Sequence, residues 1–239
     1  VADAARLLTI IASPDGRDPT ALPFANVTYE EVIKGEPTKQ KIGFMRNIGF
    51  GPTPDDEVLR LCEAGVKVFE LMGSEIQDIS PPFRNDVFIK AEYFYRTSTL
   101  AVLELLPSET REKGKVINNW AEEAKHYSGV DHYRDYLGTQ DLRSRMFSAM
   151  GDNDLLILPT VPIPPYAAEN PGLDDGDIFS PWCNTFVFNL TQQPAISVPC
   201  GKTSSGLPVG LQIVGRVHDD VCVLRAAKVY EDYSGYQVM

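Results

Sequence analysis

The sequence lacks long apolar runs and a surplus of basic residues. No hydrophobic stretch approaches the roughly 20 residues that a transmembrane helix needs. Lys and Arg number 22 against 33 Asp and Glu, which gives a formal net charge of −11. A nucleic-acid-binding surface needs clustered Lys and Arg. We therefore expect neither a membrane nor a nucleic acid among the direct partners of this chain.

Cysteine is scarce, with only four residues in 239: Cys62, Cys183, Cys200 and Cys222. Their spacing matches no metal-binding pattern, and each lies in an apolar or helical context, which favours reduced, buried thiols over disulfides. We predict no metal site and no cofactor. We assign the protein to the cytoplasm; a targeting segment, if the protein had one, would lie upstream of Val1.

Familiar catalytic motifs are missing too. The chain contains no Gly-x-Ser-x-Gly elbow, His-Glu-x-x-His motif, phosphate loop or dinucleotide fingerprint. Ser204 and Ser205 lie in a connection between two expected strands with no base close in sequence, which favours a turn over a nucleophile. The spacing of His126 and His132 does not put them on one helical face, so we expect surface or interhelix positions. We assign no catalytic residue to this chain.

The sequence does contain a strand, helix and strand pattern. Residues 41–45 and 75–79 read as strands, and residues 53–72 as an amphipathic helix between them. Thr53 is the expected N-cap of that helix. A strand–helix–strand unit within about forty residues is a parallel crossover, so the fold class is α/β. Further helices are expected at residues 1–12, 85–106, 118–150 (two or three) and after Asp219.

Two features point to a pocket wall. An apolar strand runs from Asp154 and stops at Pro159-Thr160, and a proline-rich loop over residues 161–165 follows. Ligands gather at the carboxyl ends of strands in open α/β sheets, so this rigid loop is a candidate wall. The acidic segment 169–177 is either a lid or an ordinary surface loop.

Residues 182–215 combine a helical lead-in, a polar turn and two buried strands joined by a glycine-rich connection. Four polar residues of the turn directly precede Pro194 and the apolar run 195–198; they are Asn189, Thr191, Gln192 and Gln193. Amide and hydroxyl side chains that lead into a buried strand suggest the floor of a pocket.

Several segments together resemble the C-terminal half of the amidase signature family, whose members hydrolyse or transfer amides. They are VADAA at 1–5 followed by Asp18-Pro19, the strand at 41–43, DLLILPT at 154–160, FNLTQQPAISVPCG at 188–201 and GLPVGLQIVG at 206–215. They occur in the family's order over almost the whole chain, so the set is specific although no single segment is. The resemblance implies an α/β fold with a mixed, mostly parallel sheet flanked by helices on both faces, present here in incomplete form.

The resemblance also implies that the catalytic part is missing from this chain. The family's Ser–cis-Ser–Lys triad, in which a neutral lysine acts as base through the middle serine, lies upstream of the matching segments. We therefore interpret residues 1–239 as the C-terminal part of a single amidase domain. Such a chain would supply pocket walls and be inactive alone.

The substrate-binding residues that the resemblance implies are Thr160, Cys183, Phe186, Asn189, Thr191, Gln192 and Gln193. The family usually has glycine where Gln192 stands. If that glycine supplies a positive φ or a close backbone approach, glutamine narrows the space or adds a hydrogen-bonding group. The alternative is a tolerated turn substitution.

Two other functions stay open. One is the A subunit of a glutamyl/aspartyl-tRNA amidotransferase, and the other is a non-catalytic binding or scaffold remnant of the fold. The expected partners are a small-molecule amide substrate, the missing N-terminal part of the enzyme and, in a homodimer, a second copy of the chain.

Overall fold

A five-stranded mixed sheet forms the centre of the protein. The computed structural model describes residues 1–22, 27–35, 39–169, 172–173 and 177–235. The strands, in the spatial order β2-β1-β3-β5-β4, are β1 (Lys41–Phe44), β2 (Glu75–Asp78), β3 (Leu155–Pro159), β4 (Ala195–Lys202) and β5 (Pro208–Val214). Strand β1 pairs in parallel with β2 and β3, whereas β5 pairs antiparallel with β3 and β4. Four of these five strands thus point the same way, which confirms the mixed, mostly parallel sheet.

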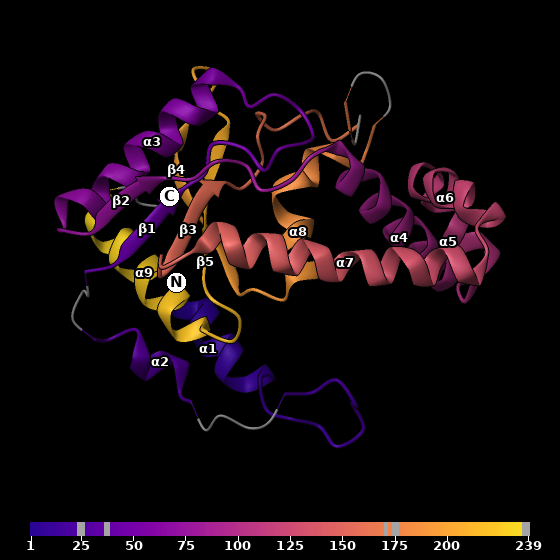
Figure 1. Cartoon of the computed structure of the whole chain (residues 1–239), viewed down its shortest axis with the longest axis horizontal. Helices are drawn as coiled ribbons and strands as arrows, with labels where there is room; N and C mark the ends of the chain where they lie inside the picture. The colour runs from indigo at the N-terminus through magenta and orange to yellow at the C-terminus, as the bar shows by residue number, and fades with distance from the viewer. Residues whose placement is uncertain (23–26, 36–38, 170–171, 174–176, 236–239) are drawn as a thin grey trace.

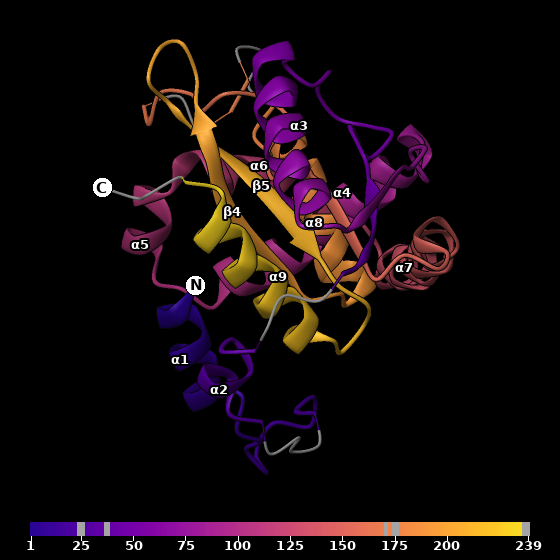
Figure 2. The same ribbon diagram turned by 90° about the vertical axis from the view of Figure 1, so that its left-hand side faces the viewer.

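Helices cover both faces of this sheet (Figures 1 and 2). The helices of the described chain are α1 (Ala2–Ile11), α2 (Tyr29–Val32), α3 (Asp56–Leu71), α4 (Asn85–Glu104), α5 (Ser108–Lys113), α6 (Lys115–Glu122), η1 (Glu123–His126), α7 (Gly129–Met150), η2 (Ser180–Trp182), α8 (Cys183–Thr191) and α9 (Asp220–Tyr233), and not all of them contact the sheet. Strand β3 explains the two layers, because its side chains alternate between them. Leu155 and Ile157 pack in the core beneath α3 and α9, and Leu156 and Leu158 pack in the core beneath α4, α7 and α8.

The start of helix α3 corrects one expectation. The cap is Asp55 rather than Thr53: the Asp55 carboxylate accepts hydrogen bonds from the backbone N–H groups of Glu57 and Val58. A carboxylate at this position both satisfies free N–H groups and complements the positive end of the helix dipole. The helix ends where expected, with Gly73 at a φ of 88°.

Four consecutive α-helices form an arm that extends beyond the sheet. Figure 1 shows α4, α5, α6 and α7 projecting to one side, with α8 between this arm and the strands. Helix α7 begins with a capping box in which the Ser128 and Asp131 side chains each accept a hydrogen bond from the other's backbone N–H. None of the described helices is long and apolar enough to cross a bilayer.

The sequence located most of these elements correctly. The expected strands at 41–45, 75–79 and 154–159 and the expected helices at 1–12 and 85–106 lie within a few residues of β1, β2, β3, α1 and α4. All four cysteines are free; Cys62 and Cys183 are buried as predicted, whereas Cys200 and Cys222 are only partly buried. Most of the segment 169–177, interpreted as a lid or a surface loop, lies outside the described residues.

Candidate functional site

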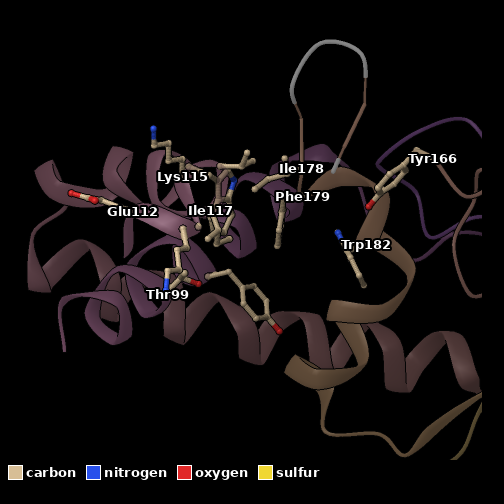
Figure 3. A pocket seen from close by; sticks show the side chains of 13 residues that line it. Thr99, Glu112, Lys115, Ile117, Tyr166, Ile178, Phe179 and Trp182 are labelled. Carbon is tan, nitrogen blue, oxygen red and sulfur yellow. The ribbon is translucent and has the colours of Figure 1, made fainter. Parts of the chain in front are cut away.

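One candidate site is an apolar cavity of about 700 Å³ between the helical arm and the segment that leads into α8. We call it the aromatic cavity. Its lining residues are Tyr95, Thr99, residues 112–117, Trp120, Tyr166, Ile178, Phe179 and Trp182. Figure 3 shows Phe179 and Trp182 beside the open space, whereas the charged ends of Glu112 and Lys115 point away from these two rings. The cavity therefore presents mainly ring and alkyl surface to a ligand.

A second cavity of about 490 Å³ adjoins the first, because Tyr166 and Trp182 line both. We call it the hydroxyl cavity. It lies where β3 ends, and its walls include the expected proline-rich loop (Ile163, Pro164, Pro165), Thr160 and Ser197. The hydroxyl oxygens of Thr160 and Ser197 are 2.6 Å apart.

Gly210 makes room for these two hydroxyl groups. A Cβ atom at this position would lie 2.6 Å from the Ser197 hydroxyl oxygen and 2.8 Å from that of Thr160. Such a contact is far inside van der Waals distance, so any larger residue would push the pair apart. The backbone of Gly210 also accepts a hydrogen bond from the Thr160 N–H at 2.9 Å. The glycine in the Pro-Val-Gly-Leu-Gln segment thus shapes the polar part of this cavity.

Helix α8 is tied to the sheet by two buried amide side chains. The Asn184 side-chain amide donates to the Pro159 carbonyl at 2.9 Å, and the Gln212 side-chain amide donates to the Asn184 carbonyl at 2.7 Å. Asn184 is 1% exposed and Gln212 is 4% exposed. Hydrogen bonds at such buried positions are expensive to lose. They fix the N-terminal end of α8 beside the end of β3, and so place Trp182 next to Thr160.

The aromatic walls are held by partners outside the cavity. The Trp120 indole N–H donates to Glu92 at 3.2 Å, and the Arg96 guanidinium lies over the Trp120 ring at 4.8 Å. Arg96 itself forms an ion pair with Glu92 at 2.7 Å. Trp120 also stacks on Phe179, with ring centroids 5.5 Å apart. Because the indole N–H is already bonded, Trp120 offers a ligand chiefly its apolar ring.

A carboxylate orders the turn that carries Phe179. One Asp177 oxygen accepts hydrogen bonds from the backbone N–H groups of Phe179 and Ser180, both at 2.9 Å. Two opposing effects act on the pKa of Asp177: partial burial favours a higher value, and the hydrogen bonds from Ser180 and Phe179 favour a lower one. The hydrogen bonds dominate, so the pKa lies below its usual value. At neutral pH the ionised carboxylate therefore holds the wall of the aromatic cavity in place.

Of the residues that the sequence suggested for substrate binding, Thr160 is the one that lines either cavity. Cys183 and Phe186 lie in the core behind the cavities, with 1% and 4% of their surface exposed. Burial raises the pKa of the Cys183 thiol to about 12, so it stays protonated at neutral pH and is no nucleophile. Phe186 stacks on Phe179 with centroids 4.7 Å apart, and so supports the cavity wall from behind.

The polar residues of the turn lie at the other end of α8. A nine-residue helix is about 13 Å long, which separates them from Trp182. Thr191 is buried, and its hydroxyl donates to the Gln193 side-chain oxygen at 2.9 Å. The Gln193 amide donates to the Gly215 carbonyl at 2.9 Å. These bonds join the end of α8 to the end of β5. Asn189 is exposed.

Gln192 is exposed and adopts a left-handed conformation, with φ 60° and ψ 35°. This is the helix C-terminal position that favours glycine. The backbone at Gln192 therefore has the positive φ for which glycine would be suited. The Gln192 side chain lines neither cavity.

The sequence did not reveal most of the aromatic cavity. Tyr95, Trp120, Tyr166 and Phe179 come from separate segments and share no motif. The signal that could have pointed to the site is the placement of both tryptophans, Trp120 and Trp182, since the chain has two in all. Within the described part of the chain, no three His, Cys, Asp or Glu side chains are arranged to hold a metal ion.

Comparison with known proteins places this fold and these segments in one family. A family model described as Amidase matches residues 1–224. An acylamidase of Rhodococcus erythropolis is 32% identical over 240 residues, which cover 97% of this chain and 50% of the relative. The A subunit of the glutamyl-tRNA(Gln) amidotransferase of Synechococcus sp. strain CC9902 is 31% identical over 97% of this chain and is itself covered to 52%. The chain thus spans about half the length of the curated relatives it matches.

Solved structures share the fold. A bacterial aryl acylamidase matches with a TM-score of 0.80 and 22% identity, over 97% of this chain and 51% of its own. A 6-aminohexanoate cyclic dimer hydrolase matches with a TM-score of 0.84 and 21% identity, over 98% of this chain and 53% of its own. The family match, which spans nearly the whole chain, and the shared mixed sheet lead to one conclusion: this chain belongs to the amidase signature family.

Proposed function

We propose that this chain is the C-terminal part of an amidase that cleaves a carboxamide C–N bond with a serine nucleophile. The observation that carries the proposal is the family match over residues 1–224 in a chain that spans half of its relatives. In this proposal, residues 1–239 belong to one domain and supply pocket walls, and the Ser–Ser–Lys triad comes from the part of the enzyme that this chain does not include.

The hydroxyl side chains of this chain support the proposal that the nucleophile lies in the missing part of the enzyme. Ser204 donates to the Glu57 carboxylate at 3.2 Å, but Ser204 is exposed and lines neither cavity. Thr160 and Ser197 are partnered with each other. A nucleophile needs an activating base within hydrogen-bond reach, and the contacts described give neither Thr160 nor Ser197 such a base.

The Thr160–Ser197 hydroxyl pair is the group of this chain that we assign to the substrate amide. Each hydroxyl can both donate and accept, so the pair can bond the carbonyl oxygen or the N–H of a carboxamide. The adjoining aromatic cavity then receives the rest of the molecule. Asn189, Thr191, Gln192 and Gln193 act in this proposal by positioning α8, with Cys183 and Phe186 packed behind the cavity walls.

An amidotransferase A subunit is the second candidate, because a relative with that name is 31% identical. A glutamine-dependent site must recognise a zwitterionic amino acid. The mainly apolar lining of the aromatic cavity favours a hydrolytic amidase instead. The scaffold remnant is the third candidate. The homodimer and the cytoplasmic location stay predictions.

The test is expression of the chain alone and together with the preceding part of the protein. We expect the chain alone to hydrolyse no amide and to resist labelling by a serine-directed phosphonate. We expect the complete protein to hydrolyse an amide and to be labelled by the phosphonate. Labelling of a serine within residues 1–239 would show that the nucleophile had been misplaced. Failure of the complete protein to hydrolyse any amide would favour the scaffold remnant, and glutaminase activity with ammonia transfer would favour the amidotransferase.

A further inference from the structure

Two of the four free thiols lie side by side on one face of the sheet. Cys62 belongs to α3 and Cys200 to β4, 138 residues further along the chain, and their sulfur atoms are 3.9 Å apart. Both thiols are free. A disulfide has a sulfur–sulfur distance of about 2.05 Å, so the two sulfurs have to approach by about 2 Å. A change of rotamer at one cysteine displaces its sulfur by more than this.

Two glycines allow α3 to pack closely against this part of the sheet. The helix lies against β4 and β5 (Figure 2). A Cβ atom at Gly65, one turn after Cys62, would lie 3.0 Å from the Leu211 side chain. A Cβ atom at Gly201 would lie 2.7 Å from the Leu61 side chain. Each glycine therefore leaves room for a leucine side chain between helix and strand, and the close packing brings the two thiols together.

A β-bulge releases Cys200 from the regular pairing of β4 with β5. Pro199 is opposite Gly210, and Gly201 is opposite Val209, so Cys200 has no partner residue on β5. The extra residue of a bulge is left unpaired and the ladder is locally disrupted. The backbone at Cys200 can therefore adjust to a new covalent bond more easily than it could at a paired position.

The other two cysteines are less suited to this pairing. Cys183 packs in the core on the opposite face of the sheet from Cys62 and Cys200. Cys222 lies on the same face as that pair, but its sulfur accepts a hydrogen bond from the Gln40 side-chain amide at 3.0 Å. Burial raises the pKa of Cys183 to about 12 and the pKa of Cys222 to about 11. Both thiols therefore stay protonated at neutral pH and react slowly.

Cys200 is the thiol that an oxidant meets first. It is partly exposed, whereas Cys62 is buried. A hydrogen bond with Cys62 lowers the pKa of Cys200, and the same contact together with burial raises the pKa of Cys62. Because the thiolate is the reactive form, Cys200 is the more reactive of the two. Its neighbours Pro199 and Val209 line the hydroxyl cavity, which gives a small oxidant a route to this part of β4.

We propose that Cys62 and Cys200 form a redox modification site, at which hydrogen peroxide converts the thiol pair into a reversible disulfide. The Cys200 thiolate attacks one peroxide oxygen, the O–O bond breaks, and a sulfenic acid and hydroxide result. The hydroxide takes up the proton that the Cys200 thiol released. The Cys62 sulfur then attacks the Cys200 sulfur, the S–O bond breaks, and the sulfenic OH leaves with the Cys62 proton as water. The two thiols lose two electrons in all, and one peroxide is reduced to two waters.

The first test is peptide mapping of the complete protein, without reduction, after treatment with hydrogen peroxide. We expect a linked peptide pair that joins Cys62 to Cys200 and that dithiothreitol releases. Cys222→Ser is the matched control, because Cys222 is also a partly buried thiol on this face of the sheet, and this variant should form the link as before. Overoxidation of Cys200 without a link, or a link from either cysteine to any other cysteine, overturns the proposal.

Trapping with dimedone, which reacts with sulfenic acids, tests the order of the two steps. In Cys62→Ser the sulfenic acid at Cys200 has no thiol to react with, so we expect a dimedone adduct at Cys200. In Cys200→Ser we expect no adduct at Cys62 at the same peroxide concentration. An adduct at Cys62 in the second variant, with none at Cys200 in the first, would contradict the assigned roles.

Urea denaturation of the oxidised and the reduced protein tests whether the native fold accommodates the link. A disulfide between residues 138 positions apart closes a long loop and restricts the unfolded chain strongly. We expect a higher urea midpoint for the oxidised protein, a rise that dithiothreitol and Cys62→Ser both remove and that Cys222→Ser retains. An equal or lower midpoint in the fully linked protein would show that the thiols meet only when the fold is disturbed, and would overturn the proposal.

Discussion

The two ends of helix α8 differ in what their side chains do. At the N-terminal end, Trp182 is half exposed between two cavities, and Asn184 anchors the helix to β3. At the C-terminal end, the Thr191 hydroxyl donates to the Gln193 side chain, and the Gln193 amide donates to the Gly215 carbonyl. The polar residues of the sequence predicted a pocket at the C-terminal end of α8, yet both cavities described above lie at its N-terminal end. Strand β4, which the sequence predicted as buried, is an edge strand with one buried residue. The polar side chains that precede it are as well explained by closing a turn as by binding a ligand.

The largest effect should come from removing Phe186, which supports the cavity wall from within the core. Phe186→Ala should lower the free energy of unfolding by about 3–5 kcal/mol, because a buried ring leaves a cavity that only partly collapses. Urea denaturation measures this change. Phe147→Ala, at a 72% exposed position, should change stability by less than about 0.5 kcal/mol. Equal losses in the two variants would contradict the assigned role.

The next effect compares two asparagines on α8. Asn184→Ala should cost about 1–3 kcal/mol, because the buried Pro159 carbonyl loses its donor. Asn189→Ala, at an exposed position where the side chain hydrogen-bonds Tyr95, should cost less, under about 1 kcal/mol. Urea denaturation of both variants measures the two losses in the free energy of unfolding. If Asn189→Ala cost as much as Asn184→Ala, the C-terminal end would matter more to the fold than its exposure indicates.

Gln192→Gly should stabilise the protein slightly. A non-glycine residue in the left-handed region costs about 1–2 kcal/mol, and the greater backbone freedom of glycine returns about 0.5–1 of this. We expect a net gain of about 0.5–1 kcal/mol in urea denaturation and an unchanged kcat/KM, because Gln192 lines neither cavity. A changed kcat/KM at equal stability would restore the C-terminal end of α8 to the substrate site.

The smallest effect concerns acid. The pKa of Asp177 is lowered in the folded protein relative to its ordinary value of 3.8. Its contribution to stability is therefore fully present above that ordinary value and is lost as the pH falls through the lower folded value. We expect the free energy of unfolding in urea to show no contribution from this titration at neutral pH and to fall as the pH drops below 3.8 and through the lowered pKa of folded Asp177.

Asp177→Asn provides the control for that titration. The asparagine oxygen still accepts hydrogen bonds from Phe179 and Ser180 but does not titrate. This variant should be nearly as stable as the original at neutral pH and should lose the part of the acid-dependent fall in stability that belongs to Asp177. An unchanged fall in Asp177→Asn would assign it to another carboxylate.

Local patterns predicted the elements better than their ends. The alternation of 41–45 and the apolar periodicity of 53–72 led directly to β1 and α3. The cap of α3 moved from Thr53 to Asp55, since two neighbouring residues can both cap a helix and the path of the preceding loop decides between them. The loop after Thr160 was expected to form a pocket wall, and it lines the hydroxyl cavity.

The aromatic cavity could not be predicted from such patterns. Tyr95 and Trp120 belong to the helical arm, while Phe179 and Trp182 belong to the entrance of α8. Their sequence separation exceeds any helical or strand period, so no local rule relates them. Only the packing of α4 and α6 against the segment 178–182 brings these rings together.

By itself the sequence determined the α/β class, the positions of the main strands, the free thiols and the membership of the amidase signature family. These follow from local periodicity and from short segments in a fixed order. The tertiary structure alone decided which end of α8 faces a cavity and which side chains line it. The physical reason is that burial and hydrogen-bond partners depend on residues distant in sequence, so the same polar side chain can close a turn or face open space.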